Sequence, residues 1–202
     1  MEKFLINIIC EDVIHEAVIK KILDSTELFE VDSPYVEGKR SNIQEKIIKY
    51  NMSAEENNFF CLVDLDFDKC APSLIKEWFD GFDKNPRLIF RVAVPEVESW
   101  LIADTKNFAR FFKIPESELI LSPEMLIDPK KYIFEKVKRF SDTPLKLDII
   151  PKRNAKIGRG YNKQMLKFID SLWDPSQACN RSNSLNRAID SVNRSISLLY
   201  NS

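Results

Sequence analysis

Acidic side chains follow three apolar runs in the first half of the sequence. Glu11 follows the first run, Asp64 and Asp66 end the second, and Glu98 follows the third, just past Pro95. Asp64 and Asp66 are two residues apart, so on an extended chain their side chains point to the same side. Carboxylates held close together repel one another, and a hard divalent cation such as Mg²⁺ relieves that repulsion. The pattern predicts a shared metal site, provided that the three runs end at one edge of a sheet.

The elements around these acids are predicted to alternate between strand and helix. Short apolar runs typical of strands occupy residues 4–10, 28–31, 57–66 and 88–94. Apolar residues at helical spacing favour helices over 13–23, 41–51 and 72–79, and from 95 onward. Because the strands are apolar on both faces, we expect a parallel sheet covered by helices. Ligands bind such sheets at the carboxyl ends of the strands, which is where the acids lie.

The second half of the sequence lacks strand signals. Apolar residues at helical spacing predict helices near 108–114, 128–140, 161–172 and 185–199. We therefore expect an α/β core over residues 1–104 and a helical, basic C-terminal extension over 105–202 that packs on this core. Trp173 is expected to pack in the core of that extension.

Basic side chains gather in the last quarter of the chain, where a segment rich in Gly and Asn precedes the helix expected to begin at Tyr161. Such a loop can approach phosphates with backbone N–H groups and cations, and Tyr161 could add a stacking surface. The predicted phosphate contacts are Lys39, Arg40, Lys152, Arg153, Lys156, Arg159 and Lys163. Lys156 is also predicted to act in catalysis, as a cation that stabilises a transition state. A solvated loop beside ordinary polar helix faces is the alternative.

Four further acids lie close to the predicted metal site. They are expected to support the metal ligands, or simply to cap helices and face water: Asp12, Glu16, Asp68 and Glu96. His15 is the single histidine, and no catalytic role is predicted for it.

Composition excludes several classes of protein. The 202 residues carry a net charge of -1, and 44% of them are hydrophobic, as in ordinary globular domains. Four glycines and no phosphate-binding Gly-rich motif argue against a common nucleotide fold. The four cysteines are widely spaced, so reduced thiols are expected rather than a zinc site. No secretory signal or membrane-length apolar run is visible, and we expect a cytoplasmic protein of prokaryotic type with no membrane partner.

Three segments carry a resemblance to a known family. They are Ile8-Ile9-Cys10-Glu11, Leu62-Val63-Asp64-Leu65-Asp66 and Glu98-Ser99-Trp100-Leu101-Ile102-Ala103-Asp104. In this order the segments resemble the TOPRIM-like signature, and most closely that of small stand-alone relatives of the OLD-family nucleases. The resemblance covers about residues 3–104.

The resemblance implies a TOPRIM-like sheet and a nuclease that depends on Mg²⁺ or Mn²⁺. Glu11 would be a metal ligand or general acid/base, Asp64 and Asp66 the metal-binding pair, and Glu98 a later ligand. It also implies a prokaryotic defence setting with an ABC-like ATPase partner.

Two functions follow from this sequence. In the first, metal-bound water attacks a phosphodiester bond of DNA or RNA, and Lys or Arg neutralises the phosphate. In the second, the chain is a non-catalytic subunit that binds nucleic acid or docks on an ATPase. The second remains open because Asp12 stands where the family commonly has Gly, and the second acid of the first motif is displaced to Glu16. Phosphatases of the haloacid-dehalogenase type are disfavoured, since their D-x-D ends the first strand.

Overall fold

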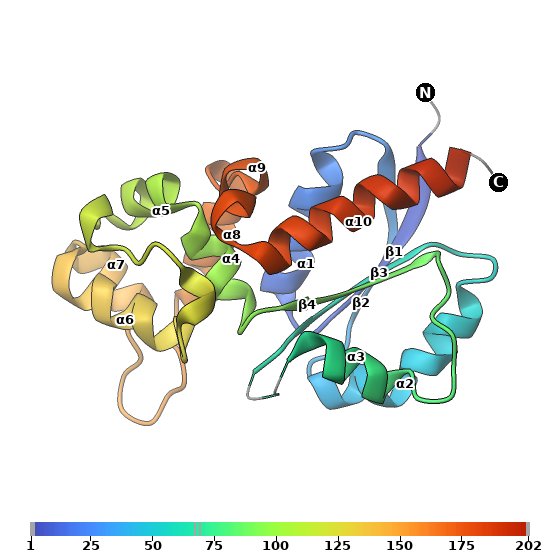
Figure 1. Cartoon of the computed structure of the whole chain (residues 1–202). Coiled ribbons are helices and arrows are strands. Elements are labelled where there is room, and N and C mark those ends of the chain that lie inside the picture. The colour runs from blue at the N-terminus through green and yellow to red at the C-terminus, as the bar shows by residue number, and fades with distance from the viewer. Residues whose placement is uncertain (1–2, 67, 69, 201–202) are drawn as a thin grey trace.

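The computed structural model describes residues 3–66, 68 and 70–200. Within them, four parallel strands form one sheet in the order β2-β1-β3-β4 (Figure 1). The strands are β1 (Phe4–Cys10), β2 (Phe29–Val36), β3 (Phe59–Asp64) and β4 (Leu88–Ala93). The predicted α/β class with a parallel sheet is confirmed. Strand β2 is longer than predicted and continues through Pro34, which an edge strand tolerates because one side of it has no partner strand.

Helices cover both faces of the sheet. The helices of this layer are α1 (Val13–Asp24), α2 (Arg40–Ser53), α3 (Ala71–Trp78) and α10 (Asn183–Tyr200). One apolar core joins α1 and α10 to the sheet, and a second joins α2 and α3 to the opposite face. Neighbouring strand residues enter different cores: Ile8 and Cys10 the first, Ile9 the second. This alternation explains why the strands are apolar throughout.

A helical lobe stands beside the sheet (Figure 1). It contains α4 (Val97–Ala103), α5 (Thr105–Phe112), α6 (Pro129–Phe140), α7 (Thr143–Ile149), α8 (Tyr161–Ser171) and α9 (Pro175–Ala178). Short 3₁₀ turns lie at 116–118, 123–125 and 179–181. The lobe shares the first apolar core with the sheet, and α8 packs on α1. Helix α10 then returns to the sheet and packs on β4, so the second half of the chain builds part of the α/β layer.

Helix α4 carries the segment that resembles the OLD-type motif, and every residue of this helix is buried. The Trp100 indole donates to Ser184 Oγ at 2.7 Å, and its carbonyl accepts from the indole of Trp173 at 3.2 Å. Asp104 caps α5 and accepts from the Asp174 N–H at 2.8 Å. The segment therefore joins the sheet to the lobe, and the predicted core position of Trp173 is confirmed.

The four cysteines are free, and Cys10 and Cys61 are buried. Among the described residues, no helix combines the length and the apolar character that crossing a membrane requires.

Candidate metal centre

Glu11 and Asp64 lie side by side because β1 and β3 are neighbours in the sheet. The Asp64 N–H donates to Glu11 Oε1 at 2.9 Å. The Val97 N–H, at the start of α4, donates to Asp64 Oδ1 at 2.8 Å. The convergence predicted for these two acids is thus observed. Each carboxylate has one oxygen held in place, and neither Glu11 Oε2 nor Asp64 Oδ2 accepts a hydrogen bond from the part of the chain that is described.

His15 completes this group, although the sequence predicted no chemical role for it. It lies on the first turn of α1, which Asp12 caps by accepting from the N–H groups of Ile14 and His15. The buried imidazole places Nδ1 2.9 Å from Asp12 Oδ1 and Nε2 3.1 Å from Asp64 Oδ1. A histidine three residues after a helix-capping acid, just past a strand, was the available signal.

The strand-end group of Glu11, His15 and Asp64 fits a divalent metal ion. One ligand atom from each residue lies within 4.8 Å of the others. Carboxylates suit Mg²⁺ and Mn²⁺, whereas imidazole suits later transition metals, so the donor set does not select one ion. The Asp12 carboxylate against Nδ1 is the usual way in which a protein orients a histidine ligand.

The charges within the strand-end group influence one another strongly. Burial raises the pKa of Glu11, and the neighbouring Asp64 raises it further. Burial alone would lower the pKa of His15, but Asp64 and Asp12 outweigh it and raise that pKa well above its ordinary value. Burial alone would raise the pKa of Asp12, but the hydrogen bond and charge of His15 bring it to about 2. The imidazole is therefore charged at neutral pH, and an ion that uses it must displace a proton.

Asp66 is not brought into the group. Strand β3 ends at Asp64, and Asp66 has a left-handed backbone with φ of 53°. The extended conformation on which the expectation for Asp64 and Asp66 rests therefore stops at Asp64, although the charges of both acids still act on Glu11. Asp66 Oδ2 lies 3.4 Å from Arg40 Nη1, and the same guanidinium pairs with Asp68. Arg40, a predicted phosphate contact, is thus occupied in holding the turn after β3.

Glu98 lies in a second cluster that adjoins Asp64. It is 1% exposed, and Tyr161 Oη donates to its Oε1 at 3.1 Å. Lys130 Nζ donates to Glu96 Oε2 at 3.0 Å and lies 3.3 Å from Glu98 Oε2, an ion pair without hydrogen-bond geometry. Burial raises the pKa of Glu98 to about 7, although Lys130 opposes this. Tyr161, predicted as a stacking surface, is instead buried.

The structure thus places a cation between the acids in three instances. His15 bridges Asp12 and Asp64, Arg40 bridges Asp66 and Asp68, and Lys130 bridges Glu96 and Glu98. Glu16 pairs with Lys20 at 2.6 Å on the surface of α1. Glu11 is the acid of the predicted set that forms no ion pair with any described residue, which leaves it the most available to a metal ion.

The sequence predicts Lys156 as the cation near the acids, whereas the structure places Lys130 there. Lys130 opens α6 directly after a helix-starting Pro, and nothing in its surroundings in the sequence marks it. Lys156 is exposed in the loop between α7 and α8 and forms no ion pair with a described residue.

The loop between α7 and α8 holds most of the predicted phosphate contacts (Figure 1). Lys152, Arg153 and Arg159 line a hollow on it. The N–H groups of Gly158 and Gly160 donate to the carbonyls of Ile149 and Asp148, so these groups are not available to cradle a phosphate. Lys39 is exposed directly before α2, and Lys163 is exposed on α8.

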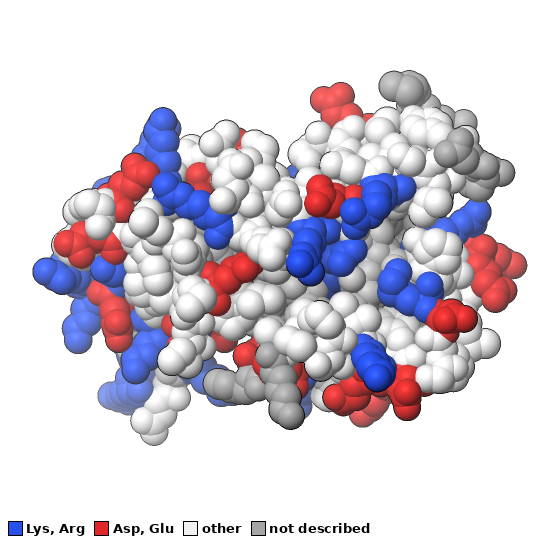
Figure 2. All heavy atoms as spheres, viewed as in Figure 1, with Lys and Arg blue, Asp and Glu red and all other residues white. Residues whose placement is uncertain are grey.

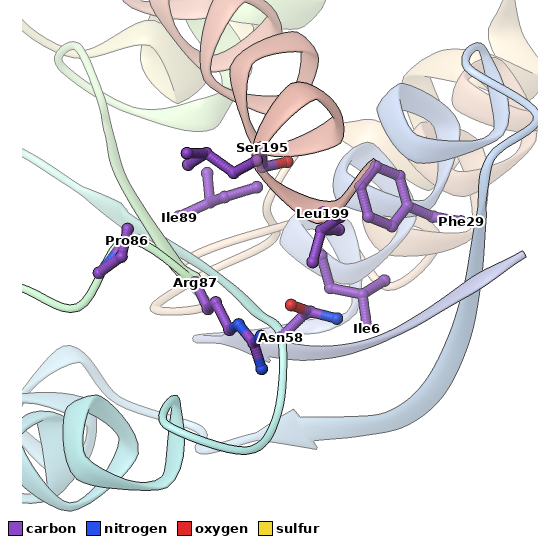
Figure 3. Close-up of a pocket in the computed structure, with 9 residues that line it drawn as sticks. Ile6, Phe29, Asn58, Pro86, Arg87, Ile89, Ser195 and Leu199 are labelled. Carbon is purple, nitrogen blue, oxygen red and sulfur yellow. The ribbon is translucent and has the colours of Figure 1, made fainter. Parts of the chain in front are cut away.

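An apolar pocket lies away from these acids, at the amino ends of the strands. Figure 3 shows its lining, which includes Ile6, Phe29, Asn58, Pro86, Arg87, Ile89, Ser195 and Leu199. The residues lining this pocket include no acid or histidine, so it is not the centre of metal chemistry.

Comparison of this chain with protein-family models, curated proteins and solved structures finds no match. The TOPRIM and OLD resemblance therefore remains a prediction.

Proposed function

We propose that this chain hydrolyses phosphodiester bonds of nucleic acid with a divalent metal ion held by Glu11, Asp64 and His15. The observation that carries the proposal is the convergence of these three side chains, whose ligand atoms lie within 4.8 Å of one another. They meet at the carboxyl ends of adjacent parallel strands, where sheets of this kind bind ligands. A metal ion there would supply a water of lowered pKa and would polarise a phosphoryl oxygen.

The residues of the chain have distinct parts in this proposal. Asp64 is positioned by the Val97 N–H and Glu11 by the Asp64 N–H, and each keeps one oxygen for the metal. Asp12 orients His15. Lys130 places a positive charge near this group. The charge of Asp64 is among those that raise the pKa of Lys130, together with the charges of Glu98 and Glu96. Lys130 therefore takes the part predicted for Lys156, which is to stabilise negative charge that develops on the phosphate.

The finer parts of the proposal come from the sequence resemblance. It favours the TOPRIM/OLD type of nuclease, Mg²⁺ or Mn²⁺ as the ion, and a prokaryotic defence setting with an ABC-like ATPase as partner, while the cytoplasmic setting rests on the widely spaced cysteines and the lack of a visible signal. Carboxylates in the donor set support the choice of ion.

A cleavage assay tests the function. Supercoiled plasmid and labelled single-stranded DNA and RNA are incubated with Mg²⁺ or Mn²⁺, with EDTA as the metal-free control. Glu11→Gln keeps an oxygen that can accept from the Asp64 N–H but removes the charge, so we expect a folded chain whose cleavage falls at least ~100-fold. Asp66→Asn is the matched control, and we expect it to keep most of the activity. Equal cleavage by the wild type and Glu11→Gln would remove this centre from the reaction.

A non-catalytic subunit is the second candidate function. It is favoured by the three bridging cations, because Asp66 and Asp68 are held by Arg40 and a charged His15 occupies the group. Metal binding by a folded wild-type chain that cleaves none of the three substrates would establish this alternative.

A further inference from the structure

Four cations gather where α10 packs on the sheet edge, and together they are named the β4–α10 basic cluster: Lys84, Arg91, Arg187 and Arg194. Arg91 lies within β4, while Arg187 and Arg194 are exposed and two turns apart on α10. Ser191 lies between them. Its Oγ accepts from the guanidinium of Arg91, and from Arg194 Nη2 at 2.8 Å. The cluster thus joins an edge strand to one stripe of a helix.

The β4–α10 basic cluster lacks carboxylate partners. None of its four cations forms an ion pair with a residue that the structure describes, and the acid whose charge acts on Arg91 is Asp190. The Nε of Arg91 is buried and has no hydrogen-bond partner. Burial and the charges of Arg194 and Arg187 lower the pKa of Arg91. Buried or crowded charges are ordinarily paired, so this surplus of positive charge fits an anion from solution.

The surface around Arg91 is hollowed on both sides. One hollow is lined by Lys84, Arg91 and Arg194, and the other, of about 340 Å³, by residues that include Arg91 and Arg187. The second hollow extends to Leu65 and Val94, which follow the carboxyl ends of β3 and β4. Figure 2 shows Lys and Arg side chains gathered in the middle of this face, over α10 and β4.

The two hollows follow the outer edge of β4, which pairs with no strand among the described residues. This edge is six residues long, or roughly 20 Å at the rise of a strand. Its carboxyl end leads to Asp64, whose backbone pairs with Ala93. A chain of phosphates along this edge would meet arginine forks in succession and would end beside the strand-end group.

We propose that the β4–α10 basic cluster binds the phosphates of a nucleic-acid strand that runs along the outer edge of β4 toward Glu11, His15 and Asp64. Arg187 and Arg194 contact phosphates from α10, and Arg91 contacts them from the strand. The binding of phosphates does not depend on the proposed nuclease function, whereas the direction of the strand rests on it. The cluster replaces the α7–α8 loop as the main phosphate-binding surface.

Fluorescence anisotropy of a labelled single-stranded oligonucleotide, measured in EDTA over a series of salt concentrations, tests the binding. The double variant Arg187→Gln/Arg194→Gln is expected to bind about 10-fold more weakly, and the slope of log affinity against log salt is expected to fall by about 1.4, as for two lost phosphate contacts. Arg187→Lys/Arg194→Lys restores the charge and should restore the slope. The matched control is Lys106→Gln/Arg110→Gln, which removes two exposed cations from α5 in the lobe and should change the affinity less than about twofold.

Three results would overturn the assignment. The first is an equal loss of affinity in the α10 and α5 variants, and the second is no loss in the α10 variant. The third is competition by poly-glutamate as strong as by the oligonucleotide at equal charge, which would indicate a surface for any acidic polymer. The binding assay contains EDTA, so it does not depend on cleavage. A chain that binds the oligonucleotide through the cluster but cleaves nothing in the separate assay with metal would support the binding site and contradict only the nuclease proposal. Cleavage by Arg187→Gln/Arg194→Gln with an unchanged KM would show that the strand takes another path.

Discussion

The carboxyl ends of the strands and the β4–α10 basic cluster both hold charged side chains against the same sheet. At the strand ends, His15, Arg40 and Lys130 each bridge two acids. In the basic cluster, Arg91 and Arg194 share the hydroxyl of Ser191 instead of a carboxylate. The first region balances its charge internally, and the second does not.

This difference indicates which charges serve stability and which are available to ligands. A buried charge that loses its partner is strongly destabilising, so the buried bridged acids of the strand ends, Asp64 and Glu98, are bound into the fold. An exposed cation without a carboxylate contributes little to stability. Glu11 is partly buried, but no described residue forms an ion pair with it, so its charge is also available to a ligand. We therefore expect substitutions of buried bridged residues to affect folding and substitutions of unbridged ones to affect binding.

Removal of Asp64 should have the largest effect. Asp64→Ala leaves His15 Nε2 and the Val97 N–H without an acceptor, while Asp12 still accepts from Nδ1, and it removes a metal ligand. We expect a loss of about 3 kcal/mol in the free energy of unfolding. Urea unfolding measures this loss, and calorimetric titration with Mn²⁺ should show that metal binding disappears.

Asp66→Ala is the control for that measurement. Asp66 lies at the same strand end, but its ion pair with Arg40 is exposed, so we expect a change below about 1 kcal/mol. An equal loss of unfolding free energy in Asp64→Ala and Asp66→Ala would mean that the burial of an ion pair does not decide how much its acid contributes to stability.

Two cation substitutions compare the regions directly. Lys130→Met removes the bridge between Glu96 and Glu98 and should cost about 2 kcal/mol at pH 8, where Glu98 is charged. Arg187→Met removes an exposed cation that has no acid partner and should change stability by less than about 0.5 kcal/mol. Thermal or urea unfolding of both variants measures the difference. A larger loss for Arg187→Met would contradict the distinction between the regions.

The pKa of Glu98 gives a dependence of stability on pH. The folded state holds a proton on Glu98 up to about pH 7, whereas the ordinary pKa of a glutamate is 4.5. Stability from this group is therefore fully present below pH 4.5 and decreases as the pH rises to 7. The amide in Glu98→Gln does not titrate in this pH range, so its contribution to stability does not change. The wild type should thus lose on the order of 2 kcal/mol relative to the variant across this range. Parallel curves for the two proteins from urea unfolding at several pH values would show that Glu98 is charged throughout.

The smallest effect is expected in the α7–α8 loop. Lys156 is exposed and unpaired among the described residues, so Lys156→Gln should leave stability within about 0.5 kcal/mol of the wild type. If the proposed cleavage is observed, its rate should change less than about twofold in Lys156→Gln and at least ~10-fold in Lys130→Gln. A larger fall in the cleavage rate for Lys156→Gln than for Lys130→Gln would support the catalytic role that the sequence predicts for Lys156.

The amino-acid sequence by itself determined the sheet and the position of the acids along it. Apolar runs such as Phe59–Asp64 specify strands locally, and their two apolar faces require helices on both sides. The acids that follow β1 and β3 had to meet once those strands were parallel neighbours. This much depends on periodicity within a few residues, which a sequence shows directly.

Only the tertiary structure decided which charges meet. His15 and Asp64 are 49 residues apart in the chain, Lys130 and Glu96 are 34 apart, and Arg91 and Ser191 are 100 apart. No local pattern encodes such pairs, because each depends on how whole helices dock on the sheet. The turn after β3 is a tertiary effect of the same kind, since the guanidinium of Arg40, from α2, donates to the Leu65 carbonyl and pairs with Asp66.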